Sequence, residues 1–162
     1  MIRADTENEV PGYSMKLGFA PIDDDHEKIL TLVAEVERSI AERASAQTLQ
    51  QSFARLVEAT VDHFRAEERG MQACGYPDLT VHRREHEEIT EWLIHLRQSL
   101  MEETSGSVSN MTRAETVAFF RAWVEQHLLQ FDAPAVRFIV GFLEDVSPAL
   151  EVVSAPGAVH SA

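Results

Sequence analysis

Residues 79–100 contain the pattern that most limits how this chain can fold. Apolar and histidine side chains recur there at alternating spacings of three and four residues. Side chains at these spacings share one face of an α-helix, whereas strand residues alternate every two positions. The pattern therefore predicts a long helix, over about residues 78–103, that packs in a bundle. The seven positions are Leu79, His82, His86, Ile89, Leu93, Leu96 and Leu100.

Two further helices are predicted earlier in the chain. The first covers about residues 23–43 and begins with three consecutive aspartates, a charge that the amino-terminal helix dipole favours. The second covers about residues 46–74. Gly75 is a typical helix stop, and Pro77 prevents continuation. The two helices before residue 78 are therefore expected to be separate neighbours of the third.

A fourth helix and a short fifth one are predicted after a polar loop at residues 104–111. Thr112 and Glu115 form a capping-box pattern for the start of the fourth helix. Pro134 suits the first turn of a short extra helix over about residues 134–145.

These elements predict an all-α fold, an up-down-up-down four-helix bundle with an N-terminal arm and a short C-terminal helix or tail. The 162 residues are enough for one domain with its own core. We expect a single domain over residues 1–162, with the arm at 1–21, the bundle at 22–145 and the tail at 146–162. The tail is expected either to dock on the bundle or to be disordered.

Composition excludes several classes of partner. The chain has 27 acidic and 14 basic residues and a formal net charge of −13, so it offers no basic surface for nucleic acid or for an anionic membrane. No apolar run reaches the length of a transmembrane helix, and the N-terminus has no signal-peptide core. The single cysteine, Cys74, fits a reducing compartment. We therefore expect a cytoplasmic protein.

Seven metal-capable side chains lie on or near the core-facing stripes. A single buried histidine is usually a hydrogen-bonded core residue, but five histidines with two carboxylates would be costly to desolvate without a partner. Metal ions would satisfy all of them, and the number of donors predicts two ions bridged by the carboxylates. Imidazole with carboxylate suits iron, and also manganese or zinc. The residues are His26, His63, Glu67, His82, His86, His127 and Asp132.

Five segments match a known family in order and spacing. They are Ile22-Asp23-Asp24-Asp25-His26, His63-Phe64-Arg65-Ala66-Glu67-Glu68 with Met71, Tyr76-Pro77, His82-x3-His86, and Trp123-x3-His127-x4-Asp132. With these segments the chain resembles the hemerythrins, specifically the single-domain bacterial form, across about residues 15–140.

The resemblance implies a di-iron centre with two unequal halves. One iron would be coordinatively filled by three histidines, and the other would keep an open position beside two histidines. Two carboxylates and an oxo or hydroxo group would bridge the pair. The implied ligands are His82, His86 and His127 for the filled iron, His26 and His63 for the open iron, and Glu67 and Asp132 for the bridge.

The resemblance also implies reversible O2 binding at the open iron, for storage, delivery or sensing, by a protein that is not an enzyme. An enzyme that acts on peroxide, nitric oxide or ferrous iron is the alternative. A third possibility is an iron buffer or interaction module in which the metal only stabilises the fold. We expect a monomer, and the sequence does not exclude a protein partner of unidentified kind.

The sequence departs from the family pattern near the expected centre. Asp25 stands where glutamine is usual, and it is expected to raise the basicity of His26 or to pair with a surface cation. Val124 stands where leucine is usual, which predicts a roomier pocket and faster autoxidation. The arm lacks the usual tryptophan, and Phe19 is its nearest aromatic residue. The expected apolar O2 pocket consists of Val124, Ile29, Leu30 and Phe64.

Overall fold

The computed structural model describes residues 16–102 and 110–154, with side chains for 16–97 and 114–146. Within these ranges every regular element is a helix, and none is a strand, so the all-α prediction is confirmed. The elements are α1 (Ala20–Ala41), α2 (Ala46–Cys74), α3 (Leu79–Glu102), α4 (Asn110–His127), the π-helical turn η2 (Leu128–Asp132) and α5 (Ala133–Ser154).

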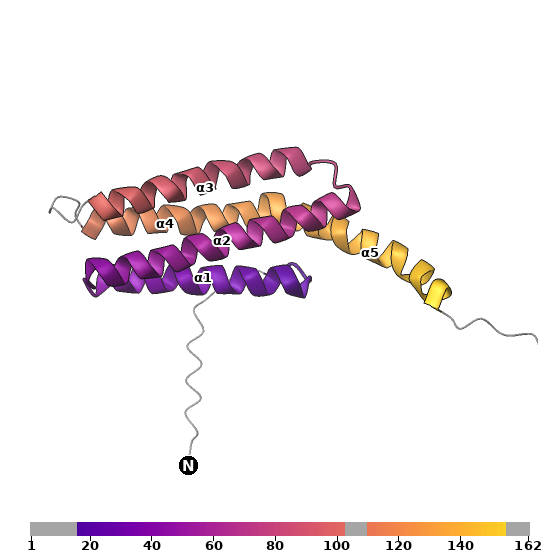
Figure 1. Ribbon diagram of the computed structural model, residues 1–162, viewed down its shortest axis with the longest axis horizontal. Coiled ribbons are helices and arrows are strands. Elements are labelled where there is room, and N and C mark those ends of the chain that lie inside the picture. Colours follow the sequence, from indigo (N-terminus) through magenta and orange to yellow (C-terminus); the bar gives the residue numbers. More distant parts are fainter. Residues whose placement is uncertain (1–15, 103–109, 155–162) are drawn as a thin grey trace, which may run out of the picture.

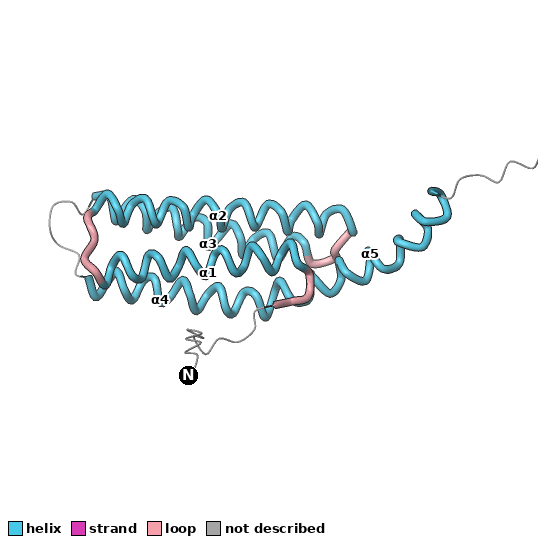
Figure 2. The backbone as a smooth tube through the Cα atoms, turned by 90° about the horizontal axis from the view of Figure 1, so that it is seen from below, coloured by secondary structure: helices cyan, strands magenta, loops and turns pink. Residues whose placement is uncertain are grey.

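Helices α1 to α4 lie side by side and alternate in direction (Figure 1). The view turned by 90° shows the axes of the same four helices aligned side by side (Figure 2). Helix α1 packs on α2 and α4, and α2 also packs on α3. The predicted up-down-up-down bundle is therefore confirmed.

Helix α1 begins at Ala20, three residues before the predicted start. The carboxylate of Asp23 in its first turn accepts hydrogen bonds from the backbone N–H groups of Leu17 at 2.6 Å and Gly18 at 3.0 Å. Pro21 fits this first turn because its missing N–H has no partner to lose there. The segment that leads into the bundle is thus tied to the helix start.

Both ends of α2 have clear local causes. Ser45 accepts a hydrogen bond from the backbone N–H of Thr48 at 3.1 Å, which caps the first turn. Gly75 has a left-handed conformation with φ of 73°, and the next residue, Tyr76, donates its N–H to the Met71 carbonyl at 2.9 Å. A side chain would strain this backbone, so glycine ends the helix as predicted.

The bundle core contains side chains from all four long helices. In the predicted α3 stripe, His82, His86, Ile89 and Leu93 are buried and Leu79 and Leu96 are half-buried, while the Leu100 side chain lies outside the described residues. Apolar residues fill the half of the bundle nearer the α1–α2 turn. The largest fully buried ones are Phe53, Phe120, Leu56, Leu93, Val33 and Val36.

Helix α5 continues from α4 through η2 and extends beyond the end of the bundle (Figure 1). Ala135 and Ile139 on its first turns pack with Met71 of α2. The helix ends at Ser154, so it is longer than the predicted 134–145 element and includes the beginning of the expected tail. Helix α4 likewise begins two residues before the predicted Thr112 cap. No helix in the described part of the chain is long and apolar enough to cross a membrane.

Candidate metal centre

The structure brings all seven predicted ligands together inside the bundle, and none is more than 4% exposed. They form two sets of donor atoms, each within 4.8 Å of one another, and the sets share both carboxylates. Helices α1, α2, α3 and α4 with η2 all contribute. One set is His82, His86, His127, Glu67 and Asp132, and the other is His26, His63, Glu67 and Asp132.

In the three-histidine set, the Nε2 atoms face one another and the carboxylates. The Nε2 atoms of His82 and His127 each lie 3.1 Å from Asp132 Oδ1. The Nε2 atom of His86 lies 3.1 Å from His127 Nε2 and 3.5 Å from Glu67 Oε2. The inner nitrogen of each ring therefore points to a common volume.

In the two-histidine set, His26 Nε2 lies 3.3 Å from Asp132 Oδ2, and His63 Nε2 lies 3.5 Å from Glu67 Oε2. Asp132 thus directs one carboxylate oxygen to each set. Glu67 Oε2 lies between the sets, because it is also 3.7 Å from His82 Nε2. This is the arrangement expected of two carboxylates that bridge two ions.

The π-helical turn η2 explains how Asp132 reaches the cluster from five residues beyond His127. In an α-helix, five residues rotate a side chain by about 140° away from the first one. A π-helical turn is wider, so the offset is smaller, and such turns often occur at functional sites. In η2, Asp132 and Leu128 are buried while the intervening Leu129 is 70% exposed.

Several polar atoms of the cluster have no hydrogen-bond partner among the described residues. They include both oxygens of Glu67, the Oδ1 atom of Asp132 and the Nε2 atoms of His26 and His82. Buried polar groups without partners are costly, and cations between these donors would satisfy them. Neutral imidazoles with two carboxylates fit two divalent ions such as iron, manganese or zinc.

Burial keeps two of the imidazoles neutral, which is the form that binds metal. Desolvation, with the neighbouring His26, lowers the pKa of His63 to about 3. Desolvation, with the neighbouring His82, lowers the pKa of His86 to about 2. One residue from each donor set is therefore ready to coordinate without first losing a proton.

The pKa values of Glu67, Asp132 and His82 are also shifted, because these groups are buried next to one another. Burial and the neighbouring Asp132 raise the pKa of Glu67 to about 7. Burial acts against the charged form of Asp132, but the close contacts with His127, His26 and His82 hold its pKa well below the usual range. Burial likewise opposes protonation of His82, yet its contacts with Asp132 and Glu67 raise its pKa to about 9. Metal binding would displace the proton from His82.

Two carboxylates outside the cluster contact its histidines. His86 Nδ1 lies 3.0 Å from Glu68 Oε1, and Arg83 Nε donates to Glu68 Oε2, also at 3.0 Å. Glu68 lies five residues after His63, off the face that His63 and Glu67 share, so spacing within α2 does not predict its contact with His86 of α3. Asp25 was expected beside His26 or a surface cation, but the structure places its Oδ2 atom 3.7 Å from His63 Nδ1.

The residues of the predicted O2 pocket belong to the core cluster next to the centre. Ile29, Phe64 and Val124 are buried, and Leu30 is half-buried. The Phe64 ring stacks on His86 with centroids 3.8 Å apart, and it lies 5.7 Å from His63. An apolar wall therefore contacts the metal-capable side chains, while its role in holding O2 stays a prediction.

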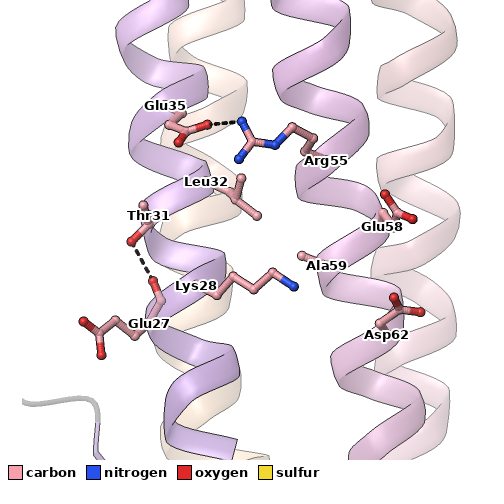
Figure 3. A pocket seen from close by; sticks show the side chains of 9 residues that line it. All are labelled: Glu27, Lys28, Thr31, Leu32, Glu35, Arg55, Glu58, Ala59 and Asp62. Atoms are coloured by element: carbon pink, nitrogen blue, oxygen red, sulfur yellow. Dashed lines mark hydrogen bonds and ion pairs between the residues drawn. The ribbon is translucent and has the colours of Figure 1, made fainter.

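The described part of the chain also has a groove away from this cluster and a cavity beside it. A groove of ≈ 480 Å³ between α1 and α2 is lined mainly by polar side chains, including Lys28, Glu35 and Arg55, and by none of the seven predicted ligands (Figure 3). A second cavity of ≈ 290 Å³ lies between the start of α1, α2 and α5. Its walls are mostly apolar, but Asp25 and Glu67 both reach it.

Fold and donor set together define a helical bundle with a buried cation-binding centre. The sequence matches the hemerythrin HHE cation-binding domain over residues 17–133, so this chain belongs to the hemerythrin family. The resemblance expected from the sequence is thereby confirmed.

Individual relatives agree with this assignment. The chain is 28% identical to a bacteriohemerythrin of Methylococcus capsulatus over 120 residues, which are 74% of this chain and 86% of the relative. It is 26% identical to a myohemerythrin of Riftia pachyptila over 119 residues, or 74% and 83% of the two chains. The crystal structure of a wild-type hemerythrin has the same fold, with a TM-score of 0.63, 24% identity, and coverage of 70% of this chain and 83% of that one.

Proposed function

We propose that this protein binds O2 reversibly at a centre of two iron ions. The observation that supports the proposal is the pair of buried donor sets that share Glu67 and Asp132. One set has three histidines and the other has two, so two ions bound there would be unequally coordinated. The ion beside His26 and His63 would keep a position open for a small ligand.

The residues of the chain would act in three ways. The five imidazoles would hold the ions through Nε2, and Glu67 and Asp132 would bridge them. Bound iron would supply the two electrons that O2 needs for reversible capture. The apolar side chains of Ile29, Phe64 and Val124 would exclude water and shield the bound gas from protonation.

The test is an optical experiment on the full chain loaded with iron. The protein is reduced without air, and its spectrum is followed through repeated cycles of O2 addition and removal. We expect two irons per chain and an absorption change that reverses in every cycle. A spectrum that changes once and does not return would contradict reversible binding.

The alternative of an enzyme is tested with the same sample. Many turnovers of peroxide or nitric oxide with a reductant, without a reversible O2 spectrum, would favour the enzyme. A chelator that removes the metal and lowers stability, with no response to any of these ligands, would favour a purely structural metal.

A further inference from the structure

Among the side chains that the structure describes, two of the five clustered histidines have a carboxylate at the ring nitrogen that faces away from the cluster. Glu68 lies at the Nδ1 atom of His86 at 3.0 Å, and Asp25 lies at the Nδ1 atom of His63 at 3.7 Å. His86 belongs to the three-histidine set and His63 to the two-histidine set. Each half of the centre thus has one outer carboxylate.

The two outer carboxylates differ in charge balance. Glu68 is paired with Arg83 at 3.0 Å, so the two side chains together bring no net charge to the three-histidine half. Asp25 has no ion pair with a lysine or arginine among the side chains that the structure describes. It therefore brings one uncompensated negative charge to the two-histidine half.

The surroundings of Asp25 make this charge effective. Its side chain is 38% exposed, but it also lines the mostly apolar cavity whose walls include Ile22 and Ile139. His63, on the other side of the contact, is buried with only 3% of its side chain exposed. Charges act more strongly through such low-polarity surroundings than through water.

We propose that Asp25 makes the two metal positions electrically unequal, so that the ion held by His26 and His63 is oxidised first. An anionic partner at the outer nitrogen raises the basicity of a ligating imidazole, and a nearby negative charge favours the more positive ion. Oxidation here means that one ferrous ion gives one electron to an external acceptor. The inference rests on the proposed di-iron function, and it assigns Asp25 as a positioning residue for His63.

The test is a redox titration of the iron-loaded full chain without O2, with an electrode and mediators as electron acceptor. The native protein should show two separate one-electron midpoint potentials. Asp25→Asn should bring them closer, so that the stability constant of the mixed-valent form falls by about tenfold, equivalent to about 1.4 kcal/mol. Asp24→Asn is the matched control, because it removes the same charge from the exposed neighbouring residue and should leave the separation unchanged.

A second variant tests the same inference by changing the charge beside the three-histidine half of the centre. Arg83→Gln leaves the charge of Glu68 uncompensated beside His86, so it should also narrow the separation. The inference is overturned if Asp25→Asn behaves like Asp24→Asn, if it widens the separation, or if the native protein shows one two-electron step. Because no O2 is present, iron-loaded protein that does not bind O2 reversibly still gives both potentials, which separates this inference from the proposed function.

Discussion

At the scale of single residues, the buried carboxylate of Glu67 lowers the stability of the metal-free fold and also lies in both donor sets. It is 2% exposed, neither of its oxygens has a hydrogen-bond partner among the residues that the structure describes, and burial with the neighbouring Asp132 raises its pKa to about 7. A raised carboxyl pKa means that the folded chain disfavours the charged form. In protein without metal, Glu67 therefore lowers the free energy of unfolding, and this effect is greatest above pH 7.

Glu67→Gln should separate metal binding from stability. The amide keeps the shape of the side chain but cannot bridge two cations, so iron content should fall from two to one or fewer per chain. The metal-free variant should be at least as stable as the native protein at pH 8, in urea unfolding. Glu58→Gln, an exposed change on the same helix, is the control for both measurements, and retention of two irons would contradict the bridging role.

Val124→Leu tests the predicted pocket. Val124 is buried three residues before His127 and belongs to the same core cluster as Phe64. A larger side chain should reduce the space beside the open ion, so autoxidation of the O2-bound protein should slow by several-fold. The decay of the absorption spectrum measures this rate, and an unchanged rate in a variant with native melting temperature would contradict the predicted pocket.

At the scale of elements, the turn between α4 and α5 decides whether the centre can be complete. The helical patterns of α2 and α3 put His63 with Glu67 and His82 with His86 on single faces, because each pair is four residues apart. These pairs could be predicted from the sequence. The placement of Asp132 could not be derived from α-helical geometry, since it depends on the wider turn η2.

Insertion of one alanine after Leu129 should disrupt the centre without unfolding the bundle. Leu129 is 70% exposed in η2, and one more helical residue there would rotate Asp132 by roughly 100° further away from His127. Iron content should fall while the helical circular dichroism signal is retained. Leu129→Ala keeps the chain length and should retain both irons, so equal iron content in the two variants would contradict the role of this turn.

At the scale of the whole molecule, four helices enclose a core that is apolar near the α1–α2 turn and polar where the ligands meet. In the metal-free protein, the buried ligands lose their contacts with water and find too few hydrogen-bond partners among the described residues to replace them. Binding that is specific to the folded state adds stability, by about 2.7 kcal/mol at a ligand concentration one hundred times the dissociation constant. Removal of iron by a chelator should therefore lower the melting temperature, and an unchanged melting temperature would contradict a ligand role for the cluster.

Acid should destabilise the metal-free protein. The folded-state pKa values of His63 and His86 are lowered from 6.5 to about 3 and about 2, so below pH 6.5 the unfolded chain binds two more protons at these sites. The folded-state pKa of Glu67 is raised from 4.5 to about 7, so in this pH range the folded chain binds one more proton at Glu67 than the unfolded chain does. Stability should thus fall between pH 6.5 and 4.5 by about 1.4 kcal/mol per pH unit for the net proton. Urea unfolding at several pH values measures the slope, and a rise in stability toward acid would contradict it.

The sequence by itself determined the helical fold, the main breaks between helices and six of the seven donors, because these depend on spacings of three and four residues within one helix. The seventh donor, Asp132, was indicated only by its position near the end of the fourth predicted helix and by the family motif. The tertiary structure decided how those donors divide into two sets that share Glu67 and Asp132. It also decided that Asp25 meets His63, and that Glu68 meets His86. Such contacts join different helices, and their geometry depends on how far each helix is rotated and shifted against its neighbour, which no local spacing specifies.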